Sequence, residues 1–237
     1  KFVPPGSKRV RCPLVRGGGT QRGDASAELG KAEQALYGSG TGRLIYRSLD
    51  RYDIQYAVRP LATMLSCPRK LDVLRLRHLV KYLLGTMEYC WWFYWQDRQK
   101  AFIGFSDSDW AEDPRTRKSV SSGYIQLGAH TIEHWVSGQQ VVALSSGEAE
   151  FYACCKAIAH LLFLLHIAAE LKHHARGWCH SDSSAARGML GRLGAGRVRH
   201  IQTRFLRVQE KRREKPFALG KVGSNIHPGD LGPKNHP

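Results

Sequence analysis

The stretch AFIGFSDSDWAEDPRTRKS, residues 101–119, decides the fold, because an apolar run in it ends directly on two aspartates. An apolar run of this kind predicts a buried β-strand over residues 101–106. Removing a carboxylate from water is costly. Asp107 and Asp109 at the end of the strand therefore have two interpretations. They lie in a solvated turn, or they meet a positive partner there.

Composition and charge narrow the class of protein. The chain has 237 residues, 42% of them hydrophobic, enough for one large domain or for a domain with an extension. Its formal net charge of +16 favours a polyanionic partner, most commonly nucleic acid, although a basic structural protein of the ribosome would show the same balance. The excess is concentrated in residues 191–221, which contain ten Lys or Arg and two Glu.

The six cysteines indicate an intracellular protein. They form no C-x-x-C pair and show no disulfide-like spacing, so we expect reduced core residues. The sequence does not separate a cytoplasmic from a nuclear location. A cluster of His and Cys over residues 173–180 lacks the paired spacing of zinc ligands. No membrane contact is expected, because the longest apolar run, LLFLLHIAA, is far shorter than the ~20 residues of a membrane span.

Three segments follow one another along the chain. Residues 1–38 are rich in Gly, Arg, Lys and Pro and are predicted to be disordered. Residues 39–96 form a helical segment, since residues 53–66 and 71–85 both carry apolar side chains at spacings of three and four. Within it, the aromatic run YCWWFYW, residues 89–95, predicts a strand packed on a core.

Residues 97–237 alternate strands with helices. Strands are predicted at 101–106, 122–128 and 131–136, the last two joined by a short turn at Gly128 and Ala129. A long helix begins at Ser145, and a strand at 176–182, a short helix at 183–193, a basic helix at 197–214 and a strand at 217–222 follow. This order predicts an α/β domain with a mixed five-stranded sheet flanked by helices, preceded by an N-terminal helical extension.

Three acids occupy unusual places in this pattern. Ser145 and Glu148 fit a capping box, which gives Glu148 a local role. Glu150 begins an almost wholly apolar helix face, where a carboxylate either tips into solvent or is paired. Asp182 ends a strand, where it caps the following helix or joins the other acids. If Asp107, Glu150 and Asp182 converge, their repulsion requires a hard divalent ion, Mg²⁺ or Mn²⁺.

Four motifs carry a resemblance to a known family. These are GFSDSDWAEDPRTRKSVSSGYIQLG at 104–128, VVALSSGEAEFYACCKAI at 141–158, CHSDSSAARGML at 179–190 and RVRHIQTRF at 197–205. Together they strongly resemble the ribonuclease H domain of copia-type retrotransposon Pol polyproteins. LDRYDIQYAVRPLATMLSCP and RHLVKYLLGT resemble the segment that joins reverse transcriptase to that domain. The likeness covers roughly residues 42–237.

The resemblance implies a ribonuclease H fold and an endonuclease that hydrolyses the RNA strand of RNA–DNA hybrids. Two Mg²⁺ or Mn²⁺ ions would be held by Asp107, Glu150, Asp182 and a fourth acid near the C-terminus. Asp230 in HPGD is the candidate for this fourth acid, where the family has a motif close to N-P-A-D. Asp109 belongs to the family pattern without being one of the four.

The basic segment after the third acid would contact phosphates without reading sequence, and the 2′-hydroxyls would distinguish a hybrid from a DNA duplex. The candidate contact residues are Arg197, Arg199, His200, Arg204, Lys211 and Arg212. The expected partners are an RNA–DNA hybrid and the rest of a Pol polyprotein.

Some positions depart from the family pattern. HPGDLGPKNHP lacks the usual residues around the last acid, and Gln202 stands where the family commonly has an acid. The chain contains no Asp-Asp pair, so the Y-x-D-D polymerase motif is absent and no polymerase activity is expected. Three hypotheses therefore remain: an active hybrid-specific endonuclease, an inactive or host-retained remnant that binds nucleic acid, and an interaction module that uses the fold as a platform.

Overall fold

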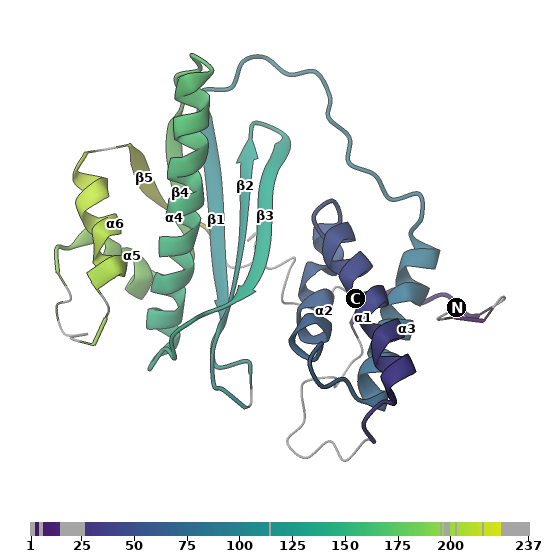
Figure 1. The fold of residues 1–237 in the computed structure, drawn as a ribbon. Coiled ribbons are helices and arrows are strands. Elements are labelled where there is room, and N and C mark those ends of the chain that lie inside the picture. Colours follow the sequence, from purple (N-terminus) through teal and green to yellow (C-terminus); the bar gives the residue numbers. More distant parts are fainter. Residues whose placement is uncertain are drawn as a thin grey trace. The chain divides into compact units, whose positions relative to one another are not determined.

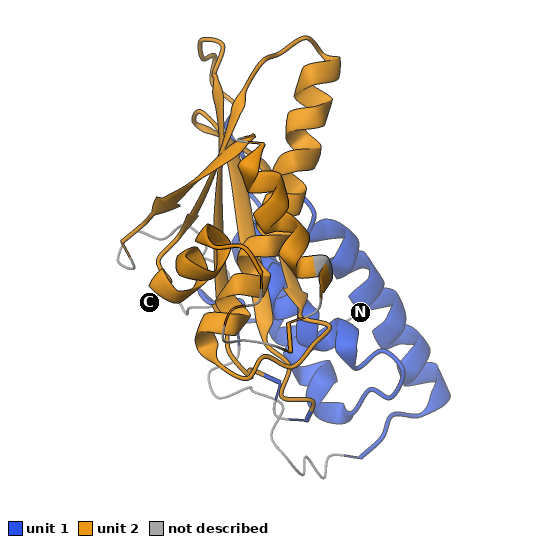
Figure 2. Cartoon of the chain, turned by 90° about the vertical axis from the view of Figure 1, so that its left-hand side faces the viewer, with its two compact units in different colours: residues 1–92, 113–115, 231–237 blue, residues 93–112, 116–230 orange. Residues whose placement is uncertain are grey.

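The computed structural model describes residues 3–4, 7–14, 27–113, 115–194, 196, 200–201, 203–214 and 216–223. The chain divides into two compact units, coloured separately in Figure 2. Unit 1 comprises residues 1–92, 113–115 and 231–237, and unit 2 comprises residues 93–112 and 116–230. The boundary falls between Trp92 and Phe93, whereas the sequence placed it after residue 96.

Unit 1 is helical. It contains α1 (Lys31–Arg47), α2 (Tyr52–Thr63) and α3 (Lys70–Gly85). α2 buries Ile54, Ala57, Val58 and Leu61, the one-sided spacing of an amphipathic helix. In α3, the Asp72 carboxylate accepts a hydrogen bond from the Arg69 N–H at 2.9 Å and so caps the first turn. The predicted helical segment is therefore present in the structure.

The prediction of disorder over residues 1–38 is wrong for its last part. α1 begins at Lys31, Leu29 and Tyr37 are buried, and the Tyr37 hydroxyl donates to the Leu61 carbonyl at 2.8 Å. Glycines at 38, 40 and 42 lower the helix propensity of this segment and hide its periodicity. Packing of Tyr37, Gly40, Thr41 and Leu44 on the helical core outweighs that propensity.

Unit 2 is built on a mixed five-stranded sheet in the order β3-β2-β1-β4-β5, as Figure 1 shows. Its strands are β1 (Ala101–Asp109), β2 (Val120–Leu127), β3 (His130–Gly138), β4 (Arg176–Ser181) and β5 (Phe217–Lys221). β2 runs antiparallel to β1 and to β3, whereas β4 runs parallel to β1 and to β5. The predicted α/β class and mixed five-stranded sheet are confirmed.

Three helices accompany the sheet: α4 (Ser146–Glu170), α5 (Ser184–Gly191) and α6 (Thr203–Arg213). α4 packs on β1, β2 and β4, and Ala149, Ala153 and Ala157 are buried there. In the described residues, α4 is also the one helix that is long and apolar enough to cross a membrane by length and composition. Half of its most apolar window is buried inside the protein, and the core helix of a globular domain passes the same test.

The aromatic run at 89–95 does not form the predicted strand. Residues 89–100 are neither helix nor strand, and Trp95 is 95% exposed. Trp91 is held at its indole N–H, which donates to the Asp50 carbonyl at 2.8 Å. A strand needs a neighbour to pair with, and the run at 89–95 pairs with none of the five described strands. Strand propensity without such a partner is therefore not sufficient.

Candidate active site

The end of β1 lies against the first turns of α4. Ser106 Oγ lies 3.2 Å from Cys154 Sγ, and Ser108 donates to Glu150 Oε1 from both its backbone N–H (3.0 Å) and its hydroxyl (2.8 Å). Alternate residues of a strand face the same side, so Ser106 and Ser108 form the surface on which α4 rests. The predicted acid on α4 is therefore tied directly to the strand that carries Asp107.

Asp107 and Asp182 lie at the same end of the sheet. β1 and β4 are parallel, and their register pairs Phe105 with His180. Each aspartate stands two residues further along its strand, so the two backbones reach the same edge. Asp182 is not the cap of α5, because Ser183 takes that role by accepting a hydrogen bond from the Ala186 N–H at 3.2 Å.

Glu150 is half-buried and poorly stabilised as an anion. Burial, together with the nearby negative charge of Asp107, raises the pKa of Glu150 to about 8, although the hydrogen bonds from Ser108 act in the opposite direction. Its second oxygen, Oε2, is buried and has no hydrogen-bond partner among the described residues. A buried acceptor without a donor is costly. A cation beside this oxygen would remove the penalty.

A hard divalent ion fits the chemistry of this pair, since carboxylate oxygens are its preferred ligands. However, the described residues contain no group of three or more His, Cys, Asp or Glu side chains arranged to hold a metal ion. The structure thus brings Glu150 into the field of Asp107 without gathering Asp182 into a complete ligand set. Asp230, the predicted fourth acid, lies outside the described residues.

Glu148, given only a capping role by the sequence, is the centre of a buried network. It is 1% exposed. Its Oε1 accepts from the Tyr152 hydroxyl at 2.6 Å, and its Oε2 accepts from the Leu144 N–H at 3.0 Å and lies 2.9 Å from His200 Nε2. Burial raises the pKa of Glu148, but these hydrogen bonds outweigh it and leave the pKa below its usual value. The spacing of Glu148 and Tyr152, one helical turn, was the available signal.

Of the six residues predicted to contact phosphate, the structure describes the side chains of His200, Lys211 and Arg212. The His200 ring meets Glu148, Lys211 Nζ pairs with Glu214 at 2.9 Å, and Arg212 Nη1 donates to the Leu190 carbonyl at 3.3 Å. Arg197 and Arg199 lie outside the described residues, and so does the side chain of Arg204, whose backbone belongs to α6. These six residues remain predicted contacts.

No family model matches the chain. It is 29% identical over 208 residues to the retrovirus-related Pol polyprotein from transposon TNT 1-94 of Nicotiana tabacum, covering 86% of this chain and 15% of the polyprotein. It is 28% identical over 130 residues to the retrovirus-related Pol polyprotein from transposon RE1 of Arabidopsis thaliana, covering 55% of this chain and 9% of that protein. Its homologues thus include retrovirus-related Pol polyproteins from plant transposons, and the chain spans less than a sixth of their length.

The chain is similar to two further proteins. A secreted RxLR effector, protein 161 of Plasmopara viticola, is 31% identical over 129 residues, 54% of this chain and 90% of the effector. Among solved structures, LC11 RNase H1 in complex with an RNA/DNA hybrid aligns with a TM-score of 0.38 at 11% identity, over 54% of this chain and 88% of that chain. The architecture of unit 2 follows from its own strand order and register.

Proposed function

We propose that the chain is a divalent-metal-dependent endonuclease that hydrolyses the RNA strand of RNA–DNA hybrids. The observation that carries this proposal is the half-buried Glu150 carboxylate, with one buried and unpartnered oxygen, beside Asp107 at the end of β1. Strongly perturbed carboxylates gather at catalytic sites. Homology to transposon Pol polyproteins and the hybrid bound by LC11 RNase H1 support the choice of substrate.

In this proposal Asp107, Glu150, Asp182 and Asp230 hold two Mg²⁺ or Mn²⁺ ions. When bound, the ions would polarise the scissile phosphate and make a water molecule more acidic. Ser108 orients Glu150 by donating two hydrogen bonds to one oxygen, which directs the ligand capacity to the other. Because the pKa of Glu150 is about 8, the residue must release a proton when it becomes a ligand. Metal binding therefore strengthens as pH rises.

The basic segment would hold the nucleic acid. Lys211 and Arg212 lie on α6, and the resemblance adds Arg197, Arg199, His200 and Arg204. Lys and Arg contacts to phosphate supply affinity that is independent of sequence and sensitive to salt. Preference for the hybrid over a DNA duplex would come from the 2′-hydroxyls of the RNA strand.

A cleavage assay tests the proposal. An end-labelled RNA–DNA hybrid, a DNA duplex and an RNA duplex are incubated with the protein in Mg²⁺ or in EDTA. We expect cleavage of the hybrid alone, in Mg²⁺ alone. Asp107→Asn and Glu150→Gln should each lower the rate by about a hundredfold or more, because each loses a metal ligand. Hybrid binding in EDTA should persist.

Asp109→Asn is the matched control, since Asp109 lies two residues along the same strand and belongs to no proposed ligand set. It should retain cleavage. Unchanged cleavage by Asp107→Asn and loss by Asp109→Asn would exchange the two assignments. A protein that binds the hybrid and never cleaves it, in Mg²⁺ or Mn²⁺, would refute the catalytic proposal and leave a nucleic-acid-binding remnant.

A further inference from the structure

A cavity of about 850 Å³ opens where the amino ends of β4 and β5 meet α5 and α6. The proposed acid site lies at the opposite end of these parallel strands. Arg176 begins β4 and lines the cavity, whereas Asp182 follows the end of the strand. Six residue steps of extended chain span roughly 20 Å. The cavity is therefore separate from the acids, and of its lining residues only Arg212 is also a proposed contact to the hybrid.

The lining is strongly basic. Four arginines contribute to it, one from β4, one from the end of α5 and two from α6: Arg176, Arg192, Arg212 and Arg213. No Asp or Glu is found among the described residues that line the cavity. Guanidinium groups repel one another, and a phosphate placed between them removes that repulsion and accepts their forked hydrogen bonds. The charge of the cavity thus fits a phosphorylated ligand.

The cavity also offers a flat apolar surface. Trp178 lines it and is 41% exposed. An exposed tryptophan next to arginines is a platform on which an aromatic ring can stack, as bases do in single-strand-binding proteins. Inorganic phosphate would leave this surface unused. A ligand that combines a phosphate with a heteroaromatic ring would use both parts.

Gln209 adds a third, independent feature. It lines the cavity and is only 4% exposed. Its amide nitrogen donates to the Met189 carbonyl at 2.8 Å and to the Gly194 carbonyl at 3.3 Å, which fixes the orientation of the amide. Its oxygen, Oε1, is buried and has no partner among the residues that the structure describes. A buried acceptor of this kind favours a ligand that brings a hydroxyl or an amino group.

From these features we propose that the cavity binds a nucleoside phosphate, either free or as the terminal nucleotide of an oligonucleotide. The arginines take the phosphate, Trp178 stacks on the base, and Gln209 accepts from a ribose hydroxyl or a base amino group. The volume lies within the range of about 300–1,000 Å³ that is usual for small-molecule sites. The site is distinct from the hydrolytic centre and needs no metal ion.

Titration calorimetry on the full chain in EDTA tests this site without involving the hydrolytic centre. The probes are ATP, AMP, inorganic triphosphate, and one short oligonucleotide with either a 5′-phosphate or a 5′-hydroxyl. Arg213→Glu is compared with Arg207→Glu, an exposed arginine on the same helix that does not line the cavity. Arg213→Glu should weaken ATP binding about tenfold or more, and Arg207→Glu less than about twofold.

Trp178→Ala separates the base from the phosphate. It should weaken ATP and AMP binding and leave inorganic triphosphate binding unchanged, with the melting temperature of each variant recorded to confirm folding. A 5′-phosphate that improves oligonucleotide binding only in the protein with Arg213 would identify the oligonucleotide end as a source of the ligand. Equal weakening by Arg213→Glu and Arg207→Glu would show general charge attraction and overturn the site. Absence of ATP binding at millimolar concentration would overturn it as well.

Discussion

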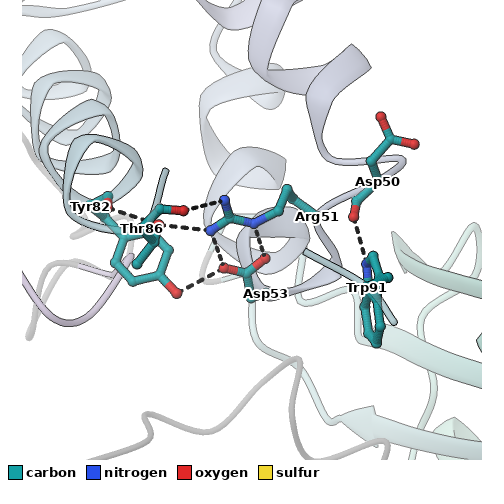
Figure 3. A network of polar contacts seen from close by, with 6 residues as sticks. All are labelled: Asp50, Arg51, Asp53, Tyr82, Thr86 and Trp91. Carbon is teal, nitrogen blue, oxygen red and sulfur yellow. Dashed lines mark hydrogen bonds and ion pairs between the residues drawn. The ribbon is translucent and has the colours of Figure 1, made fainter. Parts of the chain in front are cut away.

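Two half-buried carboxylates, one in each unit, differ in the hydrogen-bond donors that surround them. In unit 1, Asp53 accepts two hydrogen bonds from Arg51, at 2.9 and 2.8 Å, and a third from the Tyr82 hydroxyl at 2.8 Å (Figure 3). In unit 2, Glu150 receives donors from Ser108 on one oxygen only. The chain has 36 Lys and Arg available, so cations are not scarce.

The difference between the donors of Asp53 and those of Glu150 indicates which of the two acids has a structural role. Arg51 also donates to the carbonyl and hydroxyl of Thr86, so its charge is fully used inside unit 1. Burial and Asp53 together raise the pKa of Tyr82 to about 12, which keeps its hydroxyl a donor at every physiological pH. Glu150, by contrast, sits beside another acid and holds its charge poorly. An acid kept in this condition is available to an external cation.

The largest change in the free energy of unfolding is expected when the ion pair of Arg51 and Asp53 is broken. Arg51→Leu should destabilise unit 1 by about 3–5 kcal/mol, because it removes a buried cation and leaves the half-buried Asp53 without it. Arg47→Leu is the control. Its partner Asp50 is 3.8 Å away, both side chains are mostly exposed, and the expected loss is at most about 1 kcal/mol. Chemical denaturation measures both, and similar losses would show that the Asp53 site is not special.

Neutralising Glu150, the poorly stabilised acid, should raise the free energy of unfolding, whereas Arg51→Leu should lower it. A carboxyl whose pKa is raised to about 8 on folding loses stability as pH rises from about 4.5 towards 8, because the unfolded chain ionises first. Glu150→Gln should therefore be more stable than the parent in EDTA, by on the order of 2 kcal/mol at pH 8. The advantage should disappear at about pH 4.5. A loss of stability at pH 8 would show that Glu150 is held as a structural anion.

Glu148 provides the comparison within one helix. Its folded-state pKa is lowered, so its contribution is present above the unfolded value and is lost as pH falls. Glu148→Gln should cost about 1–3 kcal/mol at pH 7, since its donors lose a charged acceptor. The cost should shrink in acid. Urea unfolding at several pH values would reveal the two opposite slopes, and parallel slopes for Glu148→Gln and Glu150→Gln would contradict this account.

The smallest effect is expected on the metal requirement of cleavage, through Asp230, the fourth predicted acid. Replacing HPGDLGPK, residues 227–234, by NPADLLTK removes Gly232 and Pro233, which disfavour a helix behind Asp230. If Asp230 completes the site around Glu150, the Mg²⁺ concentration at half-maximal cleavage should fall several-fold, because a better-held ligand binds metal more tightly. Metal titration of both versions tests it. Identical midpoints would remove Asp230 from the ligand set.

Local patterns predicted most of unit 2. The turn between β2 and β3 was visible in Gly128, which has φ 61°, and the start of α4 was visible in its cap, Ser145. The predictions that failed were those that depend on residues distant in the sequence. The aromatic run at 89–95 pairs with no strand of the described sheet, which no local pattern reveals, and α1 was hidden by its glycines. The network of Glu148 depends on His200, 52 residues away.

The candidate site shows the same division. That Asp107, Glu150 and Asp182 stand out was visible from acids placed at strand ends and on an apolar helix face. Which of them interact was not, because that depends on the register of β1 with β4 and on the contact of Ser108 with α4. The cavity at the other end of β4 had no signal in the sequence at all, since its arginines come from three elements.

The small residues under α4 change how decay should be read in related transposon copies. Ala153 and Ala157 allow the helix to lie close on the sheet, and Glu150 lies near the start of the same helix. A drift to a larger side chain at Ala157 would overpack this contact and lift the helix, moving Glu150 away from Ser108. A related sequence that keeps every one of these acids can thus lose the proposed site. Counting intact acids would then overstate how many related sequences retain it.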